Sequence, residues 1–98
     1  MALDRKGTWG LGLGLKFEWD TSKARANAAK HRVTFEEALT VFGDPLSLTI
    51  PDSEHSRGER RFVTVGQSGD GRLVVVGHAD GPGGTISVIT ARLATRKE

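Results

Sequence analysis

The chain has 98 residues, of which 37% are apolar and 27% charged, with a net charge of +2 and no cysteine. This length allows one small domain, and the composition is that of a globular rather than a disordered protein. The absence of cysteine excludes disulfides and thiol chemistry, and with three histidines it argues against a zinc site. No apolar run approaches the roughly 20 residues of a membrane helix, and the N-terminus does not resemble a secretory signal. We therefore expect a cytoplasmic protein with no cofactor, no metal and no membrane contact.

The N-terminal stretch GLGLGLKFEWD, residues 10–20, alternates apolar residues with glycine or charged residues. Its evenly spaced glycines do not open a helix after a strand, as a dinucleotide-binding loop requires. Glycine also weakens the interior of a strand. We therefore expect residues 1–15 to be a flexible extension or a tag-like segment, and residues 16–98 to form a single domain that begins with the strand KFEWD.

Two helices are expected next. Asp20 is a typical N-cap for a helix over TSKARANAAKH, residues 21–31. The following stretch, VTFEEALTVFG, contains a capping box formed by Thr34 and Glu37. The glycine and proline of FGDP are typical of the end of such a helix.

After the helices the hydrophobic period changes from 3.6 to 2, which predicts strands. LSLTI, residues 46–50, predicts a strand with one buried face. RFVTVGQ and RLVVVGH flank the turn SGDG and predict a hairpin, and TISVITAR predicts the last strand. The final LATRKE predicts the opening turn of a helix.

The predicted fold class is α+β. It comprises an N-terminal strand, two helices, a four-stranded antiparallel meander and a short C-terminal helical turn. The helices pack on one face of the sheet, and the other face is left for a ligand.

Charge is segregated along the chain. Residues 16–33 contain five basic and two acidic side chains, whereas residues 34–54 contain five acidic side chains and no basic one. Basic residues again exceed acidic ones from His55 to the end. Such a distribution can hold a polyanion on one flank, although a solvated surface of mixed charge is the plain alternative.

Six fragments can be read together: FEWD, N..KH.VTFEEA, VFGDP, HS.GERRF, GRLVVV.H and ITAR.AT. In this order and spacing they resemble the BrnT family of bacterial type II toxins, small ribonucleases whose fold is similar to that of RelE and ParE toxins. The likeness extends from about Lys16 to Lys97. It implies a RelE-like endoribonuclease that inhibits translation. It also implies a BrnA-like ribbon-helix-helix antitoxin, with operator DNA bound only through the toxin–antitoxin complex.

Metal-independent cleavage of RNA requires a base for the 2′-OH, cations for the phosphorane-like transition state and an acid for the departing 5′ oxygen. Its product is a 2′,3′-cyclic phosphate. Arginine suits the cationic role because its planar fork binds two phosphate oxygens. The candidate catalytic residues are Arg92, His78, Glu59, Arg60 and His31. The candidate RNA-binding residues are Lys30, Arg61, Arg96 and Lys97.

Several alternatives remain open at this point. Arg60 and Arg61 are adjacent at the start of a strand, so only one of them can face the site. His78 is either a proton-transfer group or a hydrogen-bonded core histidine, and His55 lies in a long polar loop near Glu59. A noncatalytic binding module and a ParE-like gyrase poison remain alternative functions on the same fold.

Overall fold

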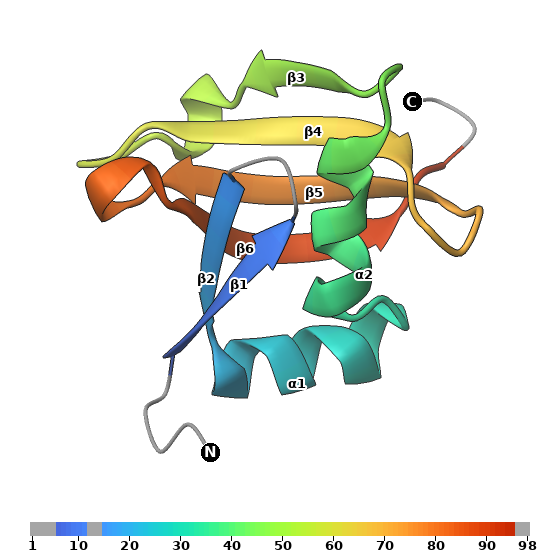
Figure 1. Cartoon of the computed structure of the whole chain (residues 1–98). Helices are drawn as coiled ribbons and strands as arrows, with labels where there is room; N and C mark the ends of the chain where they lie inside the picture. The colour runs from blue at the N-terminus through green and yellow to red at the C-terminus, as the bar shows by residue number, and fades with distance from the viewer. Residues whose placement is uncertain (1–5, 12–14, 96–98) are drawn as a thin grey trace.

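The computed structural model describes residues 6–11 and 15–95. Within these residues the chain forms an α+β fold with two α-helices, as predicted (Figure 1). The elements in chain order are β1 Lys6–Leu11, β2 Leu15–Asp20, α1 Thr21–His31, α2 Phe35–Thr40, η1 Val41–Gly43, β3 Leu48–Pro51, η2 Ser53–His55, β4 Arg61–Gln67, β5 Leu73–Asp80, η3 Pro82–Gly84 and β6 Ile86–Leu93. The elements labelled η are single 3-10 turns.

The strands form one mixed sheet in the order β1-β2-β6-β5-β4-β3. β3, β4, β5 and β6 pair antiparallel in sequence order, but β2 joins β6 in parallel, through Phe17↔Ile86 and Glu18↔Ser87. The prediction of an antiparallel four-stranded sheet is therefore incomplete. Parallel pairing needs a long connection between the two strands, and here the helices and three strands provide it.

β1 differs from the expected extension. Lys6–Leu11 pair antiparallel with β2, from Lys6↔Asp20 to Leu11↔Leu15. The prediction of a flexible segment over residues 1–15 is therefore wrong for Lys6–Leu11 and Leu15. Main-chain hydrogen bonds between the strands require no side chain, so they form in spite of the low strand propensity of glycine. The rest of that predicted segment, residues 1–5 and 12–14, lies outside the described residues.

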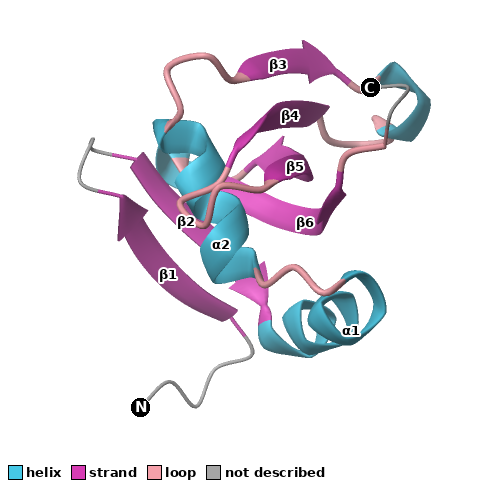
Figure 2. Cartoon of the chain, turned by 90° about the vertical axis from the view of Figure 1, so that its right-hand side faces the viewer, coloured by secondary structure: helices cyan, strands magenta, loops and turns pink. Residues whose placement is uncertain are grey.

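The sheet curls around α2, with β1 and β2 on one side of the helix and β4–β6 on the other (Figure 2). The core fills this space. Phe17 and Trp19 of β2, Phe35 of α2, and Val74 and Val76 of β5 are all buried there. The rings of Trp19 and Phe35 meet edge to face, with centroids 5.7 Å apart. The opposite face of β3–β6 carries no described α-helix, so a ligand can reach it.

Both helices begin as the sequence predicts. The Asp20 carboxylate accepts hydrogen bonds from the backbone N–H groups of Ser22 and Lys23, at 2.8 and 3.2 Å. Thr34 Oγ1 accepts one from the N–H of Glu37 at 3.0 Å. The expected capping box is only half formed, because the Glu37 carboxylate is used elsewhere.

Glu37 forms a partly buried ion pair instead. Its carboxylate accepts hydrogen bonds from the Arg72 guanidinium and from Ser68 Oγ, the latter at 2.7 Å. The hydrogen bond from Arg72 holds the pKa of Glu37 below its ordinary value, although burial acts in the opposite direction. Arg72 also donates to the carbonyl of Arg32, at 2.9 Å, where α1 ends with a left-handed φ of 59°. The ion pair thus ties the end of α1 to α2 and to the start of β5.

β3 is the last strand of the sheet, and its burial was predicted incorrectly. Leu46, Leu48 and Ile50 are 88%, 66% and 52% exposed. Their alternation does place Leu48 and Ile50 on one face, but no described element covers that face. The alternating pattern therefore predicted the strand correctly, but it did not predict whether the apolar face of the strand is buried.

The C-terminal prediction also differs from the structure. β6 extends through Leu93, and the N–H of Ala94 donates to the carbonyl of Leu73 at 3.0 Å. The predicted helical turn is therefore wrong for residues 93–95, because this segment continues along β5. Residues 96–98 lie outside the described residues.

Candidate functional site

Asn27 fixes α1 against β6. Its Nδ2 donates to the carbonyls of Val33 and Ala91 at 3.0 and 2.8 Å, and its Oδ1 accepts from the N–H of Ala91 at 3.1 Å. Asn27 is buried, so these backbone groups depend on its amide rather than on water. The amide thereby sets the position of the basic side chains of α1 beside the open face of β6.

β6 has a bulge at the point where the hollows of this surface meet. Gly77 pairs with Thr90 and His78 with Val88, which leaves Ile89 as an extra residue. A Cβ at residue 77 would come within 2.5 Å of Thr90 Oγ1, so only glycine permits this close approach. Ile89 and Thr90 therefore form a floor that is bent out of the regular sheet.

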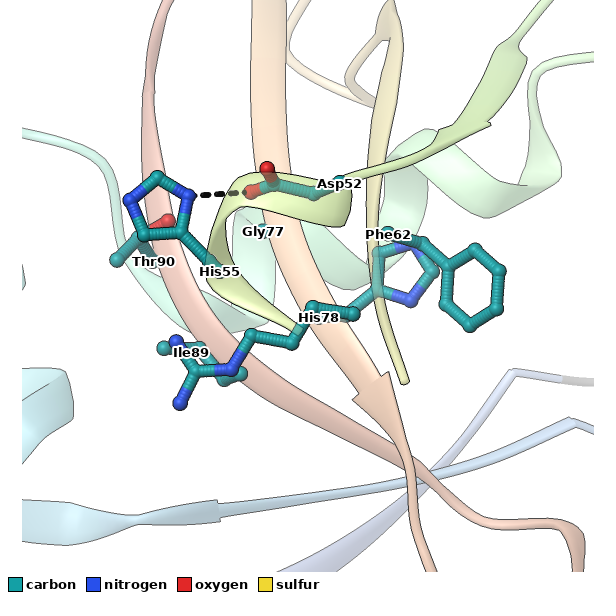
Figure 3. A pocket seen from close by; sticks show the side chains of 8 residues that line it. Asp52, His55, Phe62, Gly77, His78, Ile89 and Thr90 are labelled. Carbon is teal, nitrogen blue, oxygen red and sulfur yellow. Dashed lines mark hydrogen bonds and ion pairs between the residues drawn. The ribbon is translucent and has the colours of Figure 1, made fainter. Parts of the chain in front are cut away.

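Three neighbouring hollows lie on this surface, and Ile89 lines all three of them. One lies along α1, one lies against the start of β4, and one lies under η2 (Figure 3). We call the joined surface the β6 groove and define it by ten of the residues that line these hollows: Asp20, Lys23, Lys30, His31, Asp52, His55, Glu59, Arg61, Ile89 and Thr90. The groove brings side chains from the first helix, the long polar loop and the last strand to one place.

The β6 groove holds three cationic side chains and three carboxylates, and each carboxylate, of Asp20, Asp52 and Glu59, is engaged in a hydrogen bond within the protein. Lys23 and Lys30 come from α1 and Arg61 from β4. Arg92 lies two residues beyond Thr90 on β6, so its side chain leaves the same face of the sheet. With the groove's carboxylates engaged in these hydrogen bonds, Lys23, Lys30 and the adjoining Arg92 favour an anion beside Thr90.

The hollow under η2 contains an Asp–His pair. His55 Nδ1 lies 2.9 Å from Asp52 Oδ2, and the His55 side chain is 64% exposed (Figure 3). The carboxylate favours the proton on Nδ1, which leaves Nε2 as a hydrogen-bond acceptor. A histidine held in this way can accept a proton from a substrate hydroxyl.

The two adjacent arginines point to different places. Arg61 lines the groove, and its Nε donates to Glu59 Oε1 at 3.2 Å. Arg60 is exposed, with its guanidinium 5.3 Å from the centroid of the Phe62 ring. Glu59 therefore orients Arg61, and Arg60 does not line the β6 groove.

His78 borders the hollow of Figure 3, but its ring is turned toward the core. His78 Nε2 lies 2.7 Å from Thr64 Oγ1, and its ring packs against Phe42 and Phe62. Burial lowers the pKa of His78 to about 4, and the charge of Asp80 offsets this only in part. Of the two roles considered for this residue, the geometry favours the core histidine.

The buried His78 makes stability depend on pH. Its pKa is about 4 in the folded protein and 6.5 in the unfolded chain, so the unfolded chain takes up more protons as the pH falls through 6.5 toward 4. We expect the free energy of unfolding to fall by about 2 kcal/mol between pH 7 and pH 5 from this residue alone. Urea denaturation at the two pH values measures the change. The variant His78→Gln should show a smaller decrease, and an equal decrease in both proteins would assign the pH dependence to other groups.

The remaining candidates divide into two groups. Lys30, His31, Glu59 and Arg61 lie in the β6 groove, and Arg92 adjoins it. Arg96 and Lys97 lie outside the described residues.

Lys23, Asp52 and Thr90 were not among the site residues predicted from the sequence. Two spacings could have pointed to the first two of them. Lys23 precedes Asn27 and Lys30 by four and seven residues, which places the three on one helix face. Asp52 precedes His55 by three residues, within reach of its ring.

Over residues 6–11 and 15–95, no group of three or more His, Asp or Glu side chains is arranged to hold a metal ion. None of the helices in the same residues is long and apolar enough to cross a membrane.

Residues 19–98 match the family model described as the ribonuclease toxin BrnT of type II toxin–antitoxin systems. Among curated proteins, none matches the chain. The matched range includes α1, α2, β3, β4, β5 and β6, and therefore every residue of the β6 groove and Arg92.

Proposed function

This chain belongs to the BrnT family of ribonuclease toxins of type II toxin–antitoxin systems, and on that premise we propose that the β6 groove binds RNA and cleaves it without a metal ion. The observation that carries the proposal is the convergence of cations on one floor. Lys23 and Lys30 approach Thr90 from α1, Arg61 approaches from β4, and Arg92 follows on the same face. A phosphodiester backbone is the polyanion that such a groove fits.

The proposed reaction uses the two histidines that share a hollow with Thr90. His55 Nε2 removes the proton from the 2′-OH, and O2′ attacks phosphorus to form the O2′–P bond. The P–O5′ bond breaks, and His31 protonates the departing O5′. The products are a 2′,3′-cyclic phosphate and a 5′-hydroxyl.

The positions of the two histidines support this division of roles. Asp52 orients His55 with Nε2 as the acceptor, which suits the base. His31 lies in the last turn of α1 and lines the hollow along that helix, so we assign it the role of the acid. His31 and His55 each share a hollow with Thr90, so a phosphate bound at Thr90 adjoins both hollows.

Arg61 and Arg92 take the electrostatic role. The phosphorane carries more negative charge on its oxygens than the phosphodiester does, so fixed guanidinium groups stabilise it more strongly. Glu59 holds the Arg61 guanidinium through its Nε. Arg60 and His78 have no part in this assignment, because neither directs its side chain into the groove.

The setting of the reaction is part of the same proposal. The toxin acts in the cytoplasm, where loss of RNA inhibits translation. A BrnA-like ribbon-helix-helix antitoxin neutralises it, and the complex binds operator DNA through the antitoxin.

Purified protein should cleave RNA at an unchanged rate in excess EDTA, because proton transfer and charge stabilisation come from side chains. The measurement is cleavage of an end-labelled RNA, with the product ends identified as cyclic phosphate and 5′-hydroxyl. The control is the same reaction with Mg²⁺ restored. Cleavage that stops on chelation and returns with the metal would contradict the proposed mechanism. Intact RNA under all conditions would instead favour a binding module or a gyrase poison.

A further inference from the structure

The exposed end of the sheet carries an apolar patch. We define the β3 patch as Leu46, Leu48, Ile50, Val65 and Leu73. Four of these, Leu46, Leu48, Val65 and Leu73, line one hollow. Leu73 is 51% exposed, and Leu48 and Ile50 are more than half exposed. A contiguous exposed apolar surface of this kind on a small domain is typical of a docking site.

The β3 patch is continuous with the proposed RNA site. Leu48 pairs with Val65, Val65 with Val75, and Val75 with Arg92. Residues that pair across neighbouring strands project from the same face, so these four form one row across the sheet. At about 4.8 Å per strand, the row from Leu48 to Arg92 is roughly 14 Å long. One end of the row is apolar and the other is cationic.

The backbone edge of β3 is poorly suited to an added strand. The N–H of Asp52 donates to the carbonyl of Arg61, so in the alternating antiparallel pattern Ile50 and Leu48 also bond toward β4. The outward groups of this strand are then those of Thr49 and Pro51. Proline has no N–H, so Thr49 supplies the one outward donor within β3, and the side chains of the patch are the better surface for contact.

We propose that the β3 patch and Arg92 together bind an amphipathic helix of the antitoxin, with acidic side chains along the edge that faces Arg92. β3, β4 and β5 together span roughly 10 Å, which is about the diameter of a helix. The apolar face of the helix covers the leucines, and its acidic edge pairs with the Arg92 guanidinium. The antitoxin then occupies the place of the RNA phosphate without altering the fold. This inference rests on the proposed function, since it takes Arg92 as part of the RNA site.

The test compares the affinity of purified toxin variants for the antitoxin encoded beside this chain, and their rate of RNA cleavage without antitoxin. The double variant Leu48→Ser/Ile50→Ser should bind the antitoxin at least tenfold more weakly and cleave RNA at the wild-type rate. Leu73→Ser, on another strand, should weaken binding in the same way. The matched control is Leu93→Ser, because Leu93 is also exposed but pairs with Val74 and so projects from the opposite face.

Unchanged antitoxin affinity in both patch variants would overturn the proposal. Variants that keep their antitoxin affinity but lose RNA cleavage would also overturn it, and would assign the patch to binding of the RNA or the ribosome. Loss of affinity in a variant that also changes from dimer to monomer in sedimentation would assign the patch to a second copy and overturn it as well. A wild-type toxin that binds antitoxin but cleaves no RNA would overturn the proposed function, and the affinity comparison would still decide the docking surface. Circular dichroism confirms that each variant is folded, which the exposure of these side chains leads us to expect.

Discussion

Replacing Arg92 with alanine should lower the rate of RNA cleavage about a hundredfold and leave the fold intact. Removing one fixed charge that stabilises a transition state typically costs on the order of 3 kcal/mol of activation free energy. Arg92 is only partly buried, and its Nη1 donates to the carbonyl of the next residue, Leu93, at 3.3 Å. We therefore expect the free energy of unfolding to change by about 0.5 kcal/mol or less. Single-turnover cleavage and thermal melting measure the two effects, and expression in cells should no longer arrest growth.

The matched control for this prediction is Arg25→Ala. Arg25 is an exposed arginine of α1 and lines none of the three hollows of the β6 groove. The substitution Arg25→Ala removes the same positive charge as Arg92→Ala, so a nonspecific effect of net charge would lower the rate of RNA cleavage equally in both variants. An Arg92→Ala protein that melts normally and still cleaves RNA at the wild-type rate would remove Arg92 from the mechanism. Catalysis would then have to be sought around His55, Glu59 and Arg61.

Replacing Asn27 with alanine should destabilise the protein by about 3 kcal/mol. The substitution leaves three backbone groups without their partner, namely the N–H and carbonyl of Ala91 and the carbonyl of Val33. Because Asn27 is 8% exposed, water reaches these groups poorly and each unsatisfied group costs free energy. Urea denaturation of the wild type and the variant measures the difference.

Ser22→Ala is the control for the Asn27 prediction, because it also removes a polar side chain from α1. Ser22 is exposed and bonds through its backbone N–H rather than its hydroxyl. We expect the control to change stability by less than about 0.5 kcal/mol. Equal effects of the two substitutions would show that the backbone of Ala91 finds other partners when α1 loses its amide.

Local features of the fold could be predicted because neighbouring residues determine them. The caps of both helices depend on Asp20 and Thr34 and on N–H groups two or three residues further on. The hairpin of β4 and β5 likewise forms around an adjacent turn. The burial of β3 and the direction of β2 depend on which element lies beside each strand. Such information is spread over the whole chain, so periodicity alone identified Leu48 and Ile50 as strand residues and misplaced them in the core.

The candidate site likewise has features that the sequence predicts and features that depend on distant parts of the chain. Arginine and lysine suit phosphate wherever they occur, so residue type alone suggested Lys30, Arg61 and Arg92. The role of His78 could not be decided from the sequence, because the alternation along a strand shows which face a side chain lies on but not which element covers that face. In the structure, Phe42 and Phe62 pack against its ring. The β-bulge at Ile89 has no marker in the sequence.

The β6 groove also has a consequence for the order in which the protein becomes active during its synthesis. Its α1 wall is made of residues 23–31, whereas its floor and Arg92 lie at residues 89–92. A ribosome makes the wall first, and several seconds pass before the floor is made. A chain that ends before Ile86 lacks the floor, Arg92 and the backbone groups that Asn27 binds. With the proposed site, we therefore expect fragments that end before Ile86 to be inert, and the capacity to cut RNA to arise only after β6 has been translated.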